Sequence, residues 1–152
     1  MLHISSMPSD YGVGVFDENV IHFIDKIADM GFTYWQVLPF NPIDRANSPY
    51  CSPSAFAGNY IFINPKGLYD MGLICEEDYK SNIYDGTPYM ADYEFAGKKR
   101  LELLKKAFLN INDELARQIK EFEISNTFFV CVSLDFIPLL VENELNKFPK
   151  SR

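Results

Sequence analysis

The chain has few cysteines, few basic residues and no long apolar run, and each shortage excludes a class of protein. Its three cysteines are odd in number and widely spaced, so their pattern indicates neither a disulfide framework nor a zinc site. Basic residues number 14 against 21 acidic ones, and the net charge of −7 argues against nucleic-acid and anionic-membrane partners. The longest apolar stretch, residues 128–141, is short and interrupted by Ser133, Asp135 and Pro138, so no membrane span is expected.

What is present indicates a globular protein. The 152 residues could form one domain with a sizeable core, and 47% hydrophobic with 23% charged residues is a soluble, folded composition. Aromatic residues reach 15%, which fits either a Phe-rich core or exposed rings that act as sugar platforms. Free thiols and the lack of a signal-peptide pattern at the start predict a cytoplasmic protein.

The first part of the chain has the pattern strand, helix, strand. Residues 2–5 form a short apolar run, and Asp17 is a suitable N-cap for a helix that Gly31 closes. Residues 32–38 are rich in β-branched and aromatic residues and stop at Pro39. The spacing predicts a βαβ unit with parallel strands and a right-handed crossover.

Beyond Asn59 the pattern becomes mainly helical. Short helices are expected at residues 65–72 and 76–81, and longer ones at 91–110 and 113–124. The basic residues of the third helix (Lys98, Lys99, Arg100, Lys105 and Lys106) are interpreted as a solvated helix face. The tail is atypical because Pro138 falls inside a segment of helical composition. The predicted regions are therefore 1–58, 59–125 and 126–152.

Residues 34–59 combine an apolar strand, a loop punctuated by prolines and a turn rich in Ser, Ala and Gly. Such a unit is typical of a substrate-facing strand-to-helix loop in a (β/α)8 barrel. Pro49 and Pro53 stiffen the loop, as expected of a preorganised binding site.

Four segments in colinear order resemble the 4-alpha-glucanotransferases (amylomaltases or disproportionating enzymes, glycoside hydrolase family 77). They are HISSMPSDYGVGVF (3–16), YWQVLPFNPIDRANSPYCSPSAFAGN (34–59), NYIFINPKGLYDMGLI (59–74) and DYEFAGKKRLELLKKAF (92–108). The resemblance implies an α/β fold: an incomplete (β/α)8 TIM barrel, represented by its first two strands, with a mainly helical insertion. It also implies a retaining transfer of α-1,4-glucan segments between maltooligosaccharides, without a metal or organic cofactor.

By this resemblance Tyr50 lines the donor glucose subsite, and Ser48 and Pro49 hold the same loop. The alternative is that Tyr50 only anchors its own turn. His3 and Ser5 do not indicate a nucleophile pair, because no third group orients them.

The resemblance places the catalytic carboxylates beyond Arg152, so no catalytic residue is assigned within the chain. Asp10, Asp17 and Asp44 are interpreted as turn, cap and loop residues. The chain is accordingly expected to be an inactive fragment that a missing C-terminal segment or a second chain would complete. A stand-alone glucan-binding module and a nonfunctional remnant stay open as alternatives, and an α-amylase relative is disfavoured by the segment SPYCSPSAFAGN.

Two segments depart from the family pattern. Residues 43–47 read IDRAN where many members have TGYGD, which puts a secondary glucan site in doubt. The sequence after residue 126 shares only scattered residues with the family, and a frameshift near Phe129 is one hypothesis for that difference.

Overall fold

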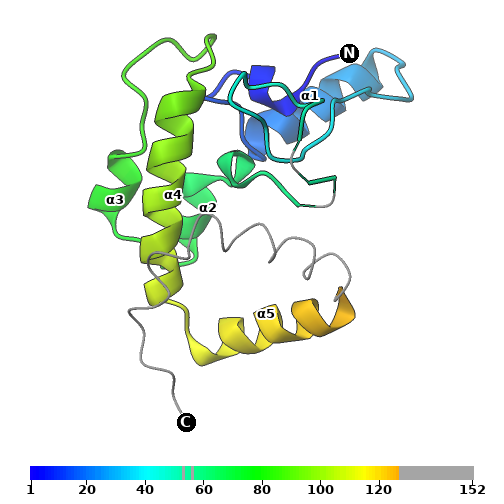
Figure 1. Cartoon of the computed structure of the whole chain (residues 1–152). Helices are drawn as coiled ribbons and strands as arrows, with labels where there is room; N and C mark the ends of the chain where they lie inside the picture. The colour runs from blue at the N-terminus through cyan, green and yellow to red at the C-terminus, as the bar shows by residue number, and fades with distance from the viewer. Residues whose placement is uncertain (53, 56, 127–152) are drawn as a thin grey trace. The chain divides into compact units, whose positions relative to one another are not determined.

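A computed structural model of the chain describes residues 1–52, 54–55 and 57–126 (Figure 1). Residues 1–39 and 59–112 form one compact unit, and residues 40–58 group with the described residues from Asp113 onward in a second. The elements of the first unit are η1 (Ile4–Ser6), α1 (Glu18–Asp29), η2 (Tyr60–Phe62), α2 (Pro65–Asp70), α3 (Glu76–Lys80) and α4 (Tyr93–Leu109). The second unit contains α5 (Asp113–Ser125). The departure expected after residue 126 lies outside the described residues.

Helix α1 begins and ends where the sequence predicts. The carboxylate of Asp17 accepts hydrogen bonds from the backbone N–H groups of Asn19 and Val20, at 3.0 and 3.3 Å. At the other end Gly31 has a positive φ of 86°, and its N–H donates to the carbonyl of Ala28 at 2.8 Å. A carboxylate cap and a left-handed glycine satisfy backbone groups that the helix itself leaves unpaired.

The two predicted strands are wrong, and with them the α/β, incomplete-barrel fold class. Within the described residues there is no β-strand: residues 4–6 form the 3-10 helix η1, and residues 32–39 have no regular secondary structure. One backbone hydrogen bond joins the two segments, from Leu2 N–H to the carbonyl of Gln36 at 3.3 Å. A strand requires a ladder of such bonds to a neighbour, and apolar composition alone does not supply one.

Helix α4 carries most of the helical packing in the first unit. Its N-cap Asp92 accepts a hydrogen bond from the N–H of Phe95 at 2.9 Å. Its buried residues recur three or four positions apart and form one face: Ala96, Arg100, Leu103 and Ala107. Helix α4 packs against η2 and α2 and runs beside them in Figure 1. The predicted helices at 65–72, 76–81, 91–110 and 113–124 are thus confirmed, within a few residues at their ends.

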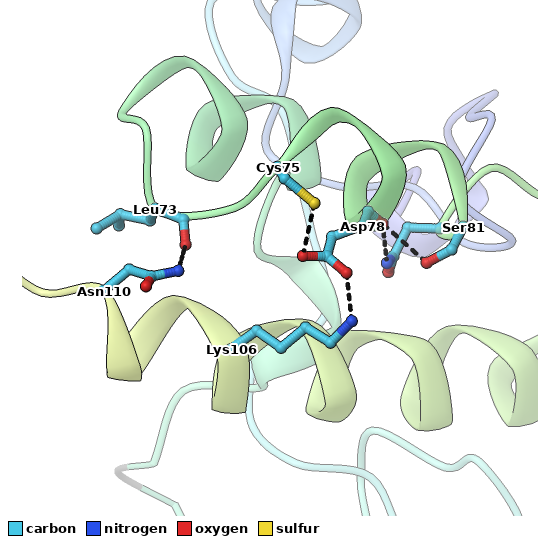
Figure 2. Close-up of polar contacts among 7 residues, drawn as sticks. Leu73, Cys75, Asp78, Ser81, Lys106 and Asn110 are labelled. Atoms are coloured by element: carbon cyan, nitrogen blue, oxygen red, sulfur yellow. Dashed lines mark hydrogen bonds and ion pairs between the residues drawn. The ribbon is translucent and has the colours of Figure 1, made fainter.

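Asp78 joins α3 to α4, as Figure 2 shows. One carboxylate oxygen accepts a hydrogen bond from the Cys75 thiol at 3.1 Å, and the other forms an ion pair with Lys106. Both contacts hold the pKa of Asp78 below its usual value, and the hydrogen bond from Lys106 is the larger cause. Close by, the side-chain amide of Asn110 donates to the carbonyl of Leu73 at 2.9 Å, which fixes the C-terminal end of α4.

Arg100 does not lie on a solvated helix face, contrary to the interpretation of the basic cluster. It is 1% exposed, whereas its neighbour Lys98 is exposed. Its Nε donates to the carbonyl of Ile61 at 3.3 Å and its Nη1 to the Asn82 side chain at 3.4 Å. Burial lowers the pKa of Arg100 to about 10, and the group therefore stays charged at neutral pH.

Candidate glucan-binding loop

The loop at residues 40–58 is organised around Asp44. Its carboxylate accepts hydrogen bonds from the backbone N–H groups of Ala46 and Ser48, both at 2.9 Å. Its carbonyl accepts from the N–H of Asn47 at 3.0 Å, and Asn47 has a φ of 59°. Asn tolerates the left-handed region better than other residues with a side chain, and Asp commonly bonds to backbone two residues on. The sequence Asp-Arg-Ala-Asn-Ser therefore forms a defined turn just before the proposed contact residue.

Tyr50 follows this turn and is largely exposed. Its backbone N–H donates to the Ser48 hydroxyl at 3.3 Å, while the residue itself is 72% exposed. Ser48 and Pro49 are half-buried. Within the described residues no hydrogen bond of the Tyr50 hydroxyl is observed. Backbone and serine contacts hold the turn, which leaves the aromatic face accessible to a ligand.

Serine and asparagine side chains fix the second half of the loop. The Ser52 hydroxyl donates to the carbonyl of Ser54 at 2.7 Å, and the Ser54 hydroxyl accepts from the N–H of Ala57 at 3.1 Å. At the base, the side-chain amide of Asn41 donates to the carbonyl of Ala57 at 3.1 Å. Sequence reasoning missed Asn41 and Ser54 as loop supports. The loop's high Ser and Asn content was the only available signal for them.

His3 and Ser5 do not form a nucleophile pair, as the sequence reasoning concluded. The His3 Nδ1 accepts from the backbone N–H of Ser5 at 3.3 Å, so the serine hydroxyl takes no part in that contact. The proton therefore resides on Nε2, which donates to the carbonyl of Pro39 at 3.2 Å. Burial lowers the pKa of His3, consistent with a neutral structural imidazole.

Two of the three carboxylates singled out in the sequence, those of Asp17 and Asp44, make structural contacts. Asp17 caps α1 and Asp44 organises the loop turn, as interpreted. Asp44 is also the only acidic residue between positions 40 and 58. In the part of the chain that the structure describes, no cluster of His, Cys, Asp and Glu could hold a metal ion. None of the helices described there is long and apolar enough to cross a bilayer.

Comparisons with known proteins agree on the family. The family model for 4-alpha-glucanotransferase, glycoside hydrolase family 77, matches residues 2–130. The 4-alpha-glucanotransferase of Aquifex aeolicus is 43% identical over 112 residues, which is 72% of this chain and 22% of that protein. The enzyme of Clostridium butyricum is 35% identical over 113 residues, 74% of this chain and 23% of that protein.

A solved structure supports the same family. The amylomaltase from Streptococcus agalactiae, determined in complex with acarbose, matches with a TM-score of 0.77 and 31% identity. The match covers 84% of this chain and 26% of that one. The chain belongs to the 4-alpha-glucanotransferase family. It spans only about a quarter of the length of these relatives.

Proposed function

We propose that this chain supplies one wall of the glucan-binding groove of a 4-alpha-glucanotransferase and does not catalyse glucan transfer by itself. The complete reaction would move α-1,4-glucan segments between maltooligosaccharides with retention of configuration. The observation that carries the proposal is the exposed ring of Tyr50 on a turn fixed by Asp44 and Ser48. Family membership gives the substrate class.

The loop has the physical properties of a sugar-binding wall. The Tyr50 ring offers a flat apolar face for a pyranose and a hydroxyl for hydrogen bonding at its edge. The hydrogen bonds of Asp44 and Ser48 restrict the loop before any ligand arrives, which lowers the entropy cost of binding. In this proposal Ser48 and Pro49 position Tyr50 and contribute little contact of their own.

The loop lacks the groups that the chemistry needs. Retaining glucan transfer requires two carboxyl groups about 5–5.5 Å apart, one as nucleophile and one as acid and then base. Asp44 is the loop's single acid, and two backbone N–H groups occupy one of its oxygens. In the proposal, the catalytic carboxylates come from the three quarters of the family chain that have no counterpart here.

Calorimetric titration with maltoheptaose tests the proposal that the chain binds glucan. Tyr50→Ala is expected to abolish measurable glucan binding, because it removes the stacking face. Tyr34→Ala is the matched control, since Tyr34 is a tyrosine with 90% exposure outside the loop, and it should bind as the unmodified chain does. Equal binding by both variants would exclude Tyr50 as the contact.

Incubation with maltotriose tests the catalytic half. The purified chain should leave maltotriose unchanged, whereas formation of maltose and longer oligomers would overturn the claim of inactivity. A chain that binds maltoheptaose through Tyr50 and leaves maltotriose unchanged would also fit a stand-alone glucan-binding module. The exposed Tyr50 ring is the observation that favours that second candidate.

A further inference from the structure

A cavity of about 130 Å³ lies in the first unit, where the loop after η1 meets the segment that precedes α4. Residues 5–7 and 12–14 line it from one stretch of chain, and residues 88–91 line it from the other. We call it the Ser5 cavity. Neither stretch belongs to the loop that carries Tyr50, so this cavity is separate from the candidate glucan-binding loop.

Backbone hydrogen bonds join the two stretches that form the Ser5 cavity. The N–H of Ser9 donates to the carbonyl of Pro88 at 3.2 Å, and the N–H of Asp92 donates to the carbonyl of Gly12 at 2.6 Å. Gly12 has a positive φ of 79°, and a Cβ there would lie 2.8 Å from the Phe95 ring, so glycine permits this close approach. The cavity is therefore formed before any ligand arrives, which lowers the entropy cost of binding.

Several polar groups of the lining residues have no partner in the protein. Ser5 is only 8% exposed, yet no described residue forms a hydrogen bond with its hydroxyl, and the same holds for the hydroxyl of Ser6. The backbone N–H groups of Gly12 and Val13 likewise find no acceptor within the described part of the chain. Buried polar groups are nearly always hydrogen-bonded, to protein or to a molecule that enters the structure. The cavity therefore suits an occupant that pairs with hydroxyl and N–H groups.

The chemistry of the lining residues favours a neutral ligand with several hydroxyls. None of these residues is charged and the chain has a net charge of −7, which disfavours an anion such as phosphate. Serine hydroxyls donate and accept hydrogen bonds, as sugar hydroxyls do. Tyr89 is 81% exposed and adds an aromatic face that suits a pyranose ring. Sites for drug-sized ligands occupy roughly 300–1,000 Å³, so this smaller cavity suits one sugar ring and not an oligosaccharide.

We propose that the Ser5 cavity binds a single neutral sugar ring. In this proposal the hydroxyls of Ser5 and Ser6 pair with hydroxyls of the sugar, and Tyr89 covers one face of the ring. Glucose is the probe, a choice that rests on the substrate class of the proposed function. The cavity itself does not depend on Tyr50, which belongs to the other unit.

Titration of the isotope-labelled chain with glucose, followed by two-dimensional NMR, tests the proposal. Glucose should shift the amide signals of Gly12, Val13 and Tyr89 and saturate with a Kd in the millimolar range, because the ligand is small. Shifts that are absent, or that do not saturate, would overturn the proposal and leave the cavity to water. Phosphate is the second probe. Shifts of the same amides with phosphate and not with glucose would assign the cavity to an anion instead.

Ser5→Ala and Ser9→Ala form a matched pair of variants. Both serines are buried, but the Ser9 hydroxyl accepts a hydrogen bond from the N–H of Tyr11 at 3.2 Å, and Ser9 does not line the cavity. Ser5→Ala should weaken glucose binding about three- to tenfold and leave the urea midpoint unchanged or higher, because the protein does not use this hydroxyl. Ser9→Ala should lower the urea midpoint and keep the glucose affinity. A lower midpoint with unchanged affinity in Ser5→Ala would make its hydroxyl structural and overturn the proposal.

Further variants keep the test decisive if Ser5→Ala does not fold. Ser6→Ala then replaces it, because Ser6 is exposed and lines the same cavity. Tyr89→Ala should also weaken glucose binding, whereas Tyr34→Ala, at a tyrosine that is 90% exposed outside the cavity, should not. Equal effects of the two tyrosine variants would overturn the proposal.

Tyr50→Ala separates the Ser5 cavity from the candidate glucan-binding loop. This variant should keep the glucose-induced shifts of Gly12 and Val13, and their loss would overturn the proposal. Millimolar binding of glucose is too weak to contribute to the calorimetric titration with maltoheptaose, so the two sites are measured independently. Glucose shifts without maltoheptaose binding would reject the Tyr50 loop alone. Maltoheptaose binding without glucose shifts would reject the Ser5 cavity alone.

Discussion

The guanidinium of Arg100 lies over the ring of Tyr11, with its central carbon 5.7 Å from the ring centroid. The Tyr11 hydroxyl is in turn 3.3 Å from that of Tyr79, and burial is the main cause that raises the pKa of Tyr11. The aromatic face, the carbonyl of Ile61 and the Asn82 side chain together surround a cation that is 1% exposed. A buried charge is stable only with such partners, so Arg100 connects α4 to η2, Tyr11 and Asn82.

Replacing Arg100 tests how much this arrangement contributes to stability. Arg100→Ala should lower the free energy of unfolding by about 2–4 kcal/mol, because it leaves a cavity and removes partners from Ile61 and Asn82. Arg100→Met should lower the free energy of unfolding by less than Arg100→Ala does, because methionine fills most of the same volume. It also removes the buried Nη2 atom, which has no hydrogen-bond partner among the described residues. Urea denaturation measures both. Lys98→Ala, at an exposed position of the same helix, is the control and should change stability by less than about 0.5 kcal/mol.

The pH dependence of stability should contain a contribution from His3. Burial lowers the folded-state pKa of His3 below its usual 6.5, so between these two pKa values the unfolded chain binds the additional proton. The stability that neutral His3 contributes is therefore complete above about pH 6.5 and decreases as the pH falls toward the folded pKa. Urea midpoints measured between pH 7.5 and 5 should show this decrease.

His3→Gln is expected to flatten the decrease over that range. His22→Gln, at an exposed position of α1, should leave it unchanged. A slope that persists in His3→Gln would assign the pH dependence to other groups. The physical reason for the expectation is that a proton on Nδ1 would face the N–H of Ser5 and lose that hydrogen bond.

Gly14 should not tolerate a side chain. A Cβ at this position would lie 1.8 Å from the carbonyl oxygen of Ile4, and backbone there cannot move aside easily. Gly14→Ala should therefore destabilise the chain by more than about 3 kcal/mol or prevent folding. Gly67→Ala is the control: its nearest atom is 4.0 Å away and it lies in α2, so it should be neutral or stabilising by up to about 1 kcal/mol. Thermal melting of the two variants measures the difference.

Local rules predicted the helices of this chain and failed for its strands. Asp17 and Gly31 determine the ends of α1 through hydrogen bonds within a few residues, and such bonds can be inferred from sequence. Residues 32–38 have strand composition, but a strand also needs a partner, and composition cannot show whether one is present. The 3-10 helix at residues 4–6 is capped by the His3 side chain, a contact that strand composition did not indicate.

The sequence pointed to the loop as a candidate site, which stays a prediction, and it did not reveal the residues that support the loop. Residues 48–50 lie within a longer segment that resembles the family, and that resemblance pointed to the loop. It can be read from the sequence without the three-dimensional structure. The contacts of Asn41 and Ser54 depend on how the loop closes, which no short motif specifies. Arg100 could have been placed correctly, because it shares the three-and-four spacing of Ala96, Leu103 and Ala107, but its basic neighbours suggested the exposed face.

The turn at Asp44 should control glucan binding without touching the glucan. Asp44→Ala removes the acceptor for the N–H groups of Ala46 and Ser48, and it thereby loosens the segment that holds Tyr50. A looser loop pays a larger ordering entropy on binding, so maltoheptaose affinity should fall about three- to tenfold while the rest of the chain keeps its stability. Calorimetric titration measures the affinity, and urea denaturation checks the stability. Asp44→Asn keeps a side-chain oxygen for the same N–H groups and should retain most of the affinity. Equal losses for Ala and Asn would indicate that the carboxylate acts through its charge, which would place Asp44 in contact with the glucan and contradict the positioning role.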